Sequence, residues 1–318
     1  MSQQTIDKLN ALTEDVAIEL DHLTKDYGKG RGIFDITFKI PKGCTFGYCG
    51  TNGSGKTTTL RHVMGFLKPD SGSVKVNGLD PWKHGEELKK VIGYLPGEIA
   101  FPPVENGSQF LKLQAEFIGL TDMSKAEKII NSLQLDPTAN LKRMSKGMKQ
   151  KTAIVAAFMH SPDIILLDEP TTGLDPLMRE AFIDALEEEK KRGATILMSN
   201  HMFDELDETC DYVAFIKDGH IVDIVDMEEI HNRPVKKFQI SFFEQSDCDK
   251  AFQGEGFEVI FRSKVTASLI VNVDVRVTDA FIKELSQYKL KGVTEIKYTL
   301  ERYFMENIGG QKDEQISE

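Results

Sequence analysis

Near its start, the chain alternates apolar and polar residues over two stretches. Residues 16–23 (VAIELDHL) and 32–40 (GIFDITFKI) repeat with a period of two, which is the pattern of a strand with one buried face. A glycine-rich segment at 27–32 separates them, and Pro41-Lys42-Gly43 ends the second stretch in a turn. The pattern predicts half-buried, antiparallel strands at the start of a domain that follows a polar N-terminal extension, residues 1–16.

Three further short runs are largely apolar and do not alternate. They are TFGYC at 45–49, IILL at 164–167 and TILMS at 195–199. Strands of a parallel sheet that is covered on both faces have this composition. Helical periods dominate from 104 to 159 and at 177–191. Strands of this kind interspersed with helices predict an α/β fold.

The pattern changes in the last third of the chain. A hairpin is predicted around Asp218-Gly219, and residues 231–234 (HNRP) are a plausible linker. Beyond the linker, the predicted order is strand, helix, strand, strand, helix, strand, at 237–242, 247–252, 257–261, 269–275, 278–288 and 294–300. This βαββαβ order is that of a ferredoxin-like domain. The chain is thereby divided into an extension (1–16), a main domain (17–230), a small accessory domain (235–305) and a flexible tail (306–318).

The composition is that of an ordinary folded protein. The chain has 318 residues, of which 40% are hydrophobic and 28% charged, and its formal net charge is −11. This length allows one large domain with its own core and a second, smaller one. A protein that grips nucleic acid usually carries a basic excess, so the acidic balance argues against a nucleic-acid partner.

The cysteines and the hydropathy pattern favour the cytosol. No Cys-x-x-Cys pair and no Cys/His group with zinc spacing occurs among Cys44, Cys49, Cys210 and Cys248. No apolar run approaches the roughly 18 residues of a membrane span, and the N-terminus lacks the basic-then-apolar order of a signal peptide. A membrane role would therefore depend on another chain.

A phosphate-binding motif directly follows the first apolar run. Residues 50–57 match G-x-x-x-x-G-K-S/T and lie between a predicted strand and a predicted helix at 57–65. Glycines let successive backbone N–H groups face a triphosphate, and the N-terminus of the next helix favours anions. We expect Lys56 to bridge the β- and γ-phosphates and Thr57 to bind Mg²⁺. The predicted nucleotide-binding residues of this segment are Gly50, Thr51, Asn52, Gly53, Ser54, Gly55, Lys56, Thr57 and Thr58.

Two carboxylates, Asp168 and Glu169, directly follow the second apolar run. Ligand sites of open α/β sheets lie beyond the carboxyl ends of the strands. We expect Asp168 to hold Mg²⁺, and Glu169 to polarise the attacking water, because phosphoryl transfer depends on positioning and electrostatic stabilisation. Alone, the pair would be interpreted as an acidic turn; beside a phosphate loop, the catalytic interpretation is favoured.

Further motifs distinguish among the classes of P-loop protein. Residues 143–151 (RMSKGMKQK) resemble the signature motif of ABC ATPases, and residues 171–176 (TTGLDP) resemble the D-loop of that family. Ser199-Asn200-His201 looks like its switch histidine, and Tyr27 looks like the aromatic residue that stacks on adenine. Together with the phosphate loop and the acid pair, these motifs occur in the family's order over residues 17–225. The chain thus resembles the ATP-binding subunit of an ABC transporter.

The resemblance implies an architecture and a set of roles. The implied fold is α/β: a P-loop NTPase core with an antiparallel β subdomain and a helical subdomain, followed by the small C-terminal α+β domain. Such subunits form head-to-tail pairs, in which the ATP of one copy is covered by the other copy's Ser145, Lys146, Gly147 and Met148. Asp175 is the D-loop aspartate. The implied catalytic residues are Glu169, His201 and Lys56, the implied metal ligands Thr57 and Asp168, and the cofactors ATP and Mg²⁺.

Three positions depart from the family pattern. Lys146 stands where glycine is usual, and Met148 stands where glutamine is usual. Gly97 occupies the place of a glutamine that ordinarily reaches Mg²⁺ or water and senses the membrane partner. Glu98 follows and could substitute for it, although an exposed loop glutamate fits this position equally well. The presence of Gly97 in place of this glutamine bears on the rate of hydrolysis and on coupling to the membrane partner.

The resemblance implies an ATP hydrolase that drives a separate transmembrane permease. The divergent signature, the C-terminal extension and the LERYF ending at 300–304 look like ATPases of drug- or peptide-export systems. The implied location is the inner face of the cell membrane, in a homodimer or heterodimer of ATPase subunits. The transported substrate and the role of the C-terminal domain are not encoded in any motif.

Two other functions share some of these motifs. One is a soluble ABC ATPase that acts on ribosomes or DNA, which the single ATPase domain, the short gap between phosphate loop and signature and the acidic charge disfavour. The other is an ATP-binding subunit without catalysis, which the presence of Lys56, Asp168, Glu169 and His201 opposes.

Overall fold

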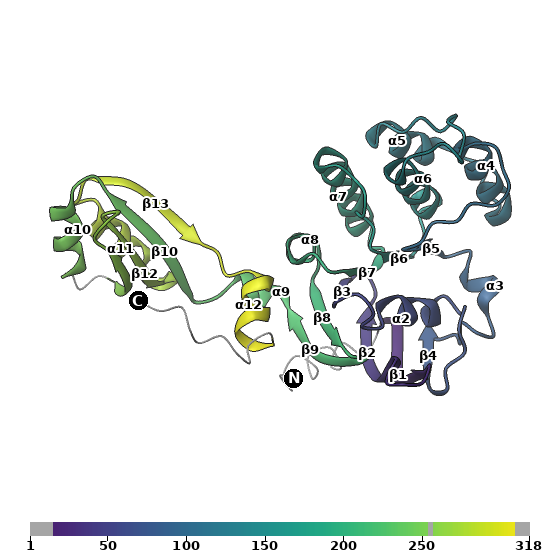
Figure 1. Ribbon diagram of the computed structural model, residues 1–318, viewed down its shortest axis with the longest axis horizontal. Helices are drawn as coiled ribbons and strands as arrows, with labels where there is room; N and C mark the ends of the chain where they lie inside the picture. Colours follow the sequence, from purple (N-terminus) through teal and green to yellow (C-terminus); the bar gives the residue numbers. More distant parts are fainter. Residues whose placement is uncertain (1–14, 254–256, 309–318) are drawn as a thin grey trace. The chain divides into compact units, whose positions relative to one another are not determined.

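The computed structural model describes residues 15–253 and 257–308 (Figure 1). Its contacts divide the chain into two units, Met1–Asp226 and Met227–Glu318. Nearly all of the predicted N-terminal extension and the last ten residues of the predicted tail lie outside the described residues.

The first unit opens with a three-stranded antiparallel sheet. β1 (Val16–Asp26) lies between β2 (Gly32–Pro41) and β4 (Ser71–Val76). In the β1–β2 ladder, Ile18 is opposite Ile40, and both side chains are fully buried. The period-two pattern therefore does place one face of the sheet in the core, which confirms the two predicted strands. The short strand β4 was not predicted.

A six-stranded sheet forms the centre of the first unit. Its order is β5-β6-β7-β3-β8-β9, parallel except for the antiparallel pair β8–β9. Every residue of β3, β6 and β7 is buried, as the apolar runs predicted. Because these strands are parallel, their carboxyl ends lie at one edge of the sheet. The strands are β3 (Thr45–Cys49), β5 (Ile92–Leu95), β6 (Ile164–Asp168), β7 (Thr195–Asn200), β8 (Tyr212–Lys217) and β9 (His220–Asp226).

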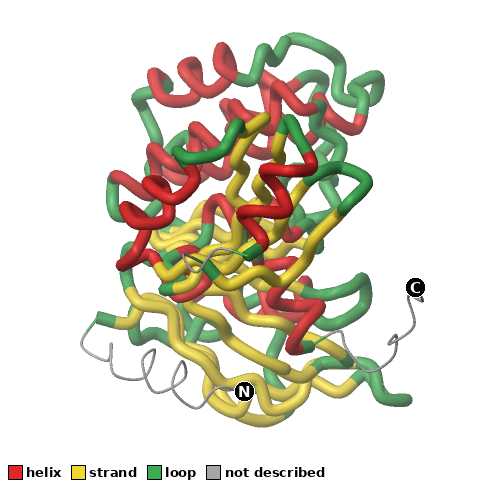
Figure 2. Tube along the Cα trace, turned by 90° about the vertical axis from the view of Figure 1, so that its left-hand side faces the viewer, coloured by secondary structure: helices red, strands yellow, loops and turns green. Residues whose placement is uncertain are grey.

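Helices follow the strands of this sheet and also form a separate subdomain. α6 packs against α4, α5 and β5, and these three helices lie at the opposite end of the unit from the antiparallel sheet (Figures 1 and 2). The predicted helical subdomain is thus confirmed. The helices of the unit are α2 (Lys56–Val63), α3 (Gly85–Leu88), α4 (Gly107–Ile118), α5 (Ser124–Ser132), α6 (Lys146–Phe158), α7 (Pro176–Lys191) and α8 (Phe203–Thr209).

The second unit is a small α+β domain. Its four-stranded sheet has the order β11-β12-β10-β13 and is antiparallel throughout. With the chain order βαββαβ, this confirms the predicted ferredoxin-like topology. The elements are α9 (Met227–His231), β10 (Val235–Phe242), α10 (Gln245–Phe252), β11 (Glu258–Ser263), β12 (Ser268–Asp274), the 3₁₀ turn η1 (Val275–Val277), α11 (Thr278–Leu285), β13 (Leu290–Ile296) and α12 (Leu300–Asn307).

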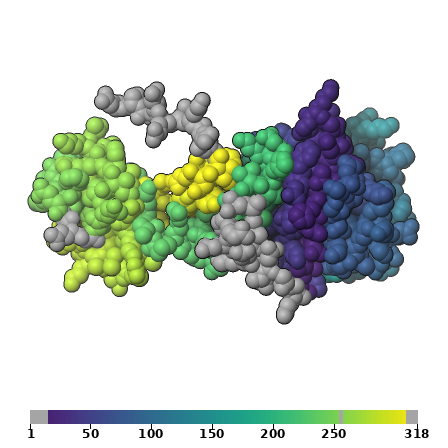
Figure 3. All heavy atoms as spheres, turned by 90° about the horizontal axis from the view of Figure 1, so that it is seen from below, coloured from purple at the N-terminus to yellow at the C-terminus, as the bar shows by residue number. Residues whose placement is uncertain are grey.

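Helices α10 and α11 share a core with one face of this sheet, and the space-filling view shows these elements as one body (Figure 3). Several predicted boundaries were wrong. Helix α11 ends at Leu285 rather than at residue 288, and the last strand begins at Leu290 rather than at residue 294. The last strand ends at Ile296 rather than at residue 300, and residues 300–307 form helix α12, where the end of a strand and the start of a tail were predicted. Thr299 begins this helix because its hydroxyl accepts a hydrogen bond from the Arg302 backbone N–H, at 3.3 Å.

Candidate active site

The phosphate loop connects the end of β3 to the start of α2. At Gly50, a Cβ would lie 2.5 Å from the Ile216 carbonyl oxygen, and at Gly55 it would lie 2.5 Å from Cγ2 of Ile33. Gly55 also has a φ of 113°, in the region that favours glycine. Neighbouring strands therefore enclose the loop so tightly that these two positions have no room for a side chain.

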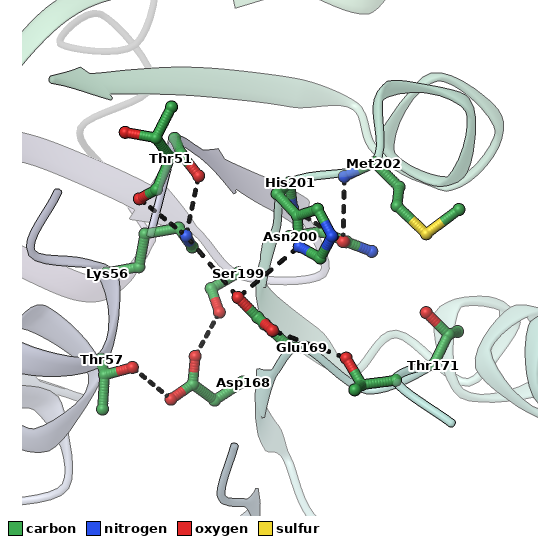
Figure 4. A network of polar contacts seen from close by, with 12 residues as sticks. Thr51, Lys56, Thr57, Asp168, Glu169, Thr171, Ser199, Asn200, His201 and Met202 are labelled. Carbon is green, nitrogen blue, oxygen red and sulfur yellow. Dashed lines mark hydrogen bonds and ion pairs between the residues drawn. The ribbon is translucent and has the colours of Figure 1, made fainter. Parts of the chain in front are cut away.

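Lys56 is held across this loop. Its side chain is 5% exposed, and Nζ donates hydrogen bonds to the carbonyl oxygens of Gly50, at 2.7 Å, and Thr51, at 3.3 Å. The same ammonium lies 3.7 Å from Oε1 of Glu169 (Figure 4). A buried cation whose partners are mainly neutral carbonyl groups is well placed to attract an anion into the loop.

The acid pair meets the start of α2 beyond the carboxyl end of β6. Asp168 accepts a hydrogen bond from the Thr57 hydroxyl at 2.7 Å, and its other oxygen accepts one from Ser199, on β7 (Figure 4). Thr57 and Asp168 are 111 positions apart in the chain. The structure thus brings together the two residues predicted to bind the metal, and both oxygens of the carboxylate are oriented by hydroxyl donors.

Glu169 lies between Lys56 and His201. Its Oε1 is 3.7 Å from Lys56 Nζ and 3.6 Å from His201 Nδ1. Its φ is 51°, an uncommon conformation for a residue other than glycine, which is found disproportionately at functional sites. The buried side chain of Gln150 supports this turn by donating a hydrogen bond to the Pro170 carbonyl oxygen, at 2.6 Å.

A network that the sequence did not predict positions the His201 segment. The Asn200 side-chain oxygen accepts hydrogen bonds from the backbone N–H groups of His201, at 2.7 Å, and Met202, at 3.1 Å. Its amide donates to buried Glu205, which also accepts from the Thr171 hydroxyl at 2.6 Å and is paired with Arg179 at 3.0 Å. Motifs show only that these residues flank the site; their contacts depend on α8 packing beside β7.

A pocket of about 480 Å³ lies at this edge of the sheet. It is lined by nine predicted residues: Tyr27, Asn52, Gly53, Gly55, Lys56, Thr57, Thr58, Asp168 and Glu169. Seven residues that were not predicted as site residues also line it: Arg31, Gly32, Arg61, Tyr94, Pro96, Gly97 and Glu98. Burial, with a smaller contribution from the Asp168 carboxylate, raises the pKa of Tyr94 to about 12.

The signature residues do not line the pocket of their own chain. Ser145 begins α6, where its side chain accepts a hydrogen bond from the Met148 N–H at 3.2 Å. A Cβ on Gly147 would lie 2.7 Å from the Gly173 carbonyl oxygen, so the signature packs closely on the segment before α7. Asp175 begins α7 in the same way, by accepting a hydrogen bond from the Met178 N–H at 3.0 Å. Lys146 also contributes to this packing through the carbons of its side chain.

The donor set of the pocket fits Mg²⁺. Within the described residues, no group of three or more His, Cys, Asp or Glu side chains is arranged to hold a metal. Mg²⁺ is commonly bound by one or two protein oxygens together with substrate phosphates and water. The hydroxyl of Thr57 and the carboxylate of Asp168, 2.7 Å apart beside the phosphate loop, match that requirement.

Comparisons with known proteins agree with this site. The ABC transporter family model matches residues 33–172. The chain is 31% identical to the ABC transporter ATP-binding protein MJ1023 of Methanocaldococcus jannaschii, over 84% of this chain and 98% of that protein. It is 28% identical to the bacitracin transport ATP-binding protein BcrA of Bacillus licheniformis, over 92% of this chain and 97% of that protein. A solved ATP-binding subunit of an ABC transporter superposes with a TM-score of 0.62 and 28% identity, over 68% and 92% of the two chains.

The chain therefore belongs to the ABC transporter family, as its motifs indicated. Within that family it is an ATP-binding subunit with a P-loop NTPase fold, and its activity is the hydrolysis of Mg-ATP. Among the described residues, no helix is both long and apolar enough to cross a membrane.

Proposed function

We propose that this chain powers an export-type ABC transporter by hydrolysing ATP between two ATPase subunits. The observation that carries the proposal is the meeting of two segments that are far apart in the sequence. Lys56 and Thr57 of the phosphate loop lie 3.7 Å and 2.7 Å from Glu169 and Asp168, respectively. These four side chains supply a phosphate cradle, a metal site and a base in one pocket.

Binding is assigned to the phosphate loop and its neighbours. The loop's N–H groups and Lys56 hold the β- and γ-phosphates, and Tyr27, which is 47% exposed on the pocket wall, stacks on adenine. Thr57 and Asp168 would hold Mg²⁺, which would neutralise charge on the phosphates. Lys56 then exchanges its carbonyl partners for phosphate oxygens, and its ion pair with Glu169 weakens.

Hydrolysis is assigned to Glu169 and His201. Glu169 orients a water molecule for in-line attack on the γ-phosphorus and takes its proton, while the bond from phosphorus to the β-phosphate oxygen breaks. The products are ADP and phosphate. His201, 3.6 Å from Glu169, holds the γ-phosphate and the water, and Asn200 fixes the segment that carries it. These roles rest on the contacts that connect Glu169 to His201 and His201 to Asn200.

A second subunit completes the site in this proposal. The start of α6 has an oriented N-terminus, with Ser145 as its cap, yet it does not line the pocket of its own chain. Head-to-tail pairing brings Ser145, Gly147 and the neighbouring N–H groups of one copy to the γ-phosphate in the other. The pair is two copies of this chain or this chain with a related one.

Export is supported by the full-length similarity to BcrA, a bacitracin transport protein, which extends through the C-terminal unit. We infer that the chain acts on a separate transmembrane permease at the cytoplasmic face of the cell membrane. From the name of this relative we infer a drug or peptide as the class of cargo.

The test is Glu169→Gln. We expect the variant to bind Mg-ATP, to form an ATP-dependent dimer in size-exclusion chromatography with light scattering, and to lose turnover by about 100-fold or more. Glu188→Gln is a matched control, because Glu188 lies on the surface of α7, in an ion pair with Lys128. Turnover like that of the wild type in Glu169→Gln would overturn the catalytic assignment. For the membrane role, the chain should co-purify with a polytopic protein when the two are expressed together.

A further inference from the structure

Arg31 lies in a rigid turn on the pocket wall. The Tyr27 N–H donates to the Arg31 carbonyl oxygen at 2.8 Å, and the Arg31 N–H donates to the Gly28 carbonyl oxygen at 3.2 Å. Gly32 follows with a φ of 150°, and a Cβ there would collide with the Lys25 carbonyl group. The turn therefore keeps Arg31 beside Tyr27 without help from a ligand.

The residues after Arg31 pack directly on the phosphate loop. A Cβ on Gly55 would lie 2.5 Å from Ile33 Cγ2 and 3.3 Å from the Gly32 carbonyl oxygen. Gly219 contacts both segments. Its N–H donates a hydrogen bond to the carbonyl oxygen of Ser54 in the phosphate loop, at 3.1 Å, and a Cβ at this position would lie 2.6 Å from the Gly32 carbonyl oxygen. Backbone contacts thus fix the position of Arg31 relative to the loop.

The exposed side chain of Arg31 has no ion-pair partner within the described residues. Its side chain makes no ion pair or hydrogen bond there, whereas Lys56 is paired with Glu169. Asp26, at the start of the turn, accepts a hydrogen bond from the Gly28 N–H at 2.7 Å and forms no ion pair with Arg31. An uncompensated guanidinium in a pocket that also contains a phosphate loop is suited to an anion.

The position of Arg31 selects which phosphates it meets. Thr57, Asp168 and Glu169 mark the γ-phosphate end of the pocket, and Tyr27 marks the adenine end. Arg31 is hydrogen-bonded to Tyr27 through the backbone, so it belongs to the adenine end, next to the loop. With adenine on Tyr27 and the γ-phosphate beside Glu169, as proposed above, the phosphates on the Arg31 side of the pocket are those nearest the sugar, which ATP and ADP share.

We propose that Arg31 is a second phosphate-binding cation, which binds the phosphates common to ATP and ADP and thereby sets how tightly ADP is retained after hydrolysis. This inference rests on the proposed nucleotide pocket. It assigns to Arg31 phosphates that remain in ADP, whereas Lys56 also holds the γ-phosphate that is released.

The experiment compares Arg31→Ala, Arg31→Lys and Lys29→Asn by calorimetric titration with Mg-ATP, Mg-ADP and adenosine. We expect Arg31→Ala to weaken ATP and ADP by a similar factor, about tenfold, which is the order for one charge-assisted contact at a partly exposed site. Arg31→Lys retains part of the affinity, and adenosine binding is unchanged. Lys29→Asn is the matched control, because it removes the same charge from the same turn at a residue that does not line the pocket, and asparagine tolerates its φ of 58°.

The outcomes separate the inference from the function on which it rests. If Arg31→Ala and the wild type bind ADP with equal affinity, the inference alone is overturned. It is also overturned if Arg31→Ala loses as much affinity for adenosine as for ADP, because Arg31 would then contact the base. A loss confined to ATP would also overturn it, since that result would place Arg31 at the γ-phosphate. Absence of Mg-ATP and Mg-ADP binding by the wild type would instead overturn the proposed function. In turnover assays, the inhibition constant for ADP should rise in Arg31→Ala by the same factor as the dissociation constant.

Discussion

Gly97 leaves little room for a side chain beside the proposed metal carboxylate. A Cβ at this position would lie 3.1 Å from Oδ2 of Asp168 and 3.3 Å from its Cγ. Oδ2 is also the atom that accepts the Thr57 hydroxyl, at 2.7 Å. The glutamine that is usual here in ABC ATPases would therefore press on Asp168 unless the segment moved. We predict that Gly97→Ala disturbs the metal site through this contact.

The size of the effect follows from the distances. Ordinary carbon–oxygen contacts begin near 3.4 Å, so Asp168 must move by a few tenths of an ångström. A misplacement of 1 Å at a reacting centre costs roughly 100-fold in rate, and a shift of about a third of that size is expected to cost about fivefold. Global stability should change by only about 1 kcal/mol, because Gly97 lies in an exposed segment.

The assay is phosphate release by the purified chain over a range of MgCl₂ concentrations at saturating ATP. Gly97→Ala should lower the maximal rate about fivefold and raise the Mg²⁺ concentration at half-maximal rate. Gly85→Ala is the control, because the nearest atoms to a Cβ at Gly85 belong to the end of the Lys89 side chain, at 4.0 Å. A rate and Mg²⁺ dependence identical to the wild type in Gly97→Ala would refute the steric argument.

Two other predictions concern the signature and the buried thiols. A Cβ at Gly147 would lie 2.7 Å from the Gly173 carbonyl oxygen, so Gly147→Ala should displace the signature. We expect ATPase activity to fall about tenfold, while the ATP affinity measured by calorimetry stays the same. Undiminished turnover would contradict the assignment of the signature to the site of the other subunit. Burial raises the pKa values of Cys49 and Cys210 from 9.0 to about 12, so the native protein should resist alkylation at pH 8. The unfolded thiols ionise first, so the free energy of unfolding should be unaffected below pH 9 and should fall by up to about 1.4 kcal/mol per pH unit per thiol between 9 and 12. Urea titrations of the wild type and of Cys210→Ala at pH 8 and pH 10 measure this pH-dependent part of the free energy of unfolding. An identical pH dependence in both proteins would exclude a contribution from Cys210.

The sequence predicted much of the candidate site because much of it is local. The phosphate loop is one continuous segment between a strand and a helix, and the combination of its glycines and its lysine identifies it. The acid pair and the switch histidine each follow a run of apolar residues, and strands that are buried on both faces have that composition. These features could be placed at the same edge of a parallel sheet before any coordinates were known.

Weakly patterned elements and long-range contacts were harder to predict. β4 is short, and its first residues are exposed, so it lacks a clear alternation. Helix α12 was missed because its apolar residues resemble the end of a strand, whereas Thr299 starts a helix there. Ser199 belongs to the motif that contains His201, but its hydrogen bond to Asp168 depends on β7 lying next to β6.

The sequence alone determined the class of protein, because each motif consists of a few neighbouring residues whose backbone and side chains act together. Tertiary structure decided which residues share the pocket: the order β5-β6-β7-β3 brings Gly97 against Asp168, and the packing of β2 on the phosphate loop brings Arg31 beside it. Contacts of this kind join residues from separate elements, and their geometry follows from how the sheets pack rather than from any local pattern.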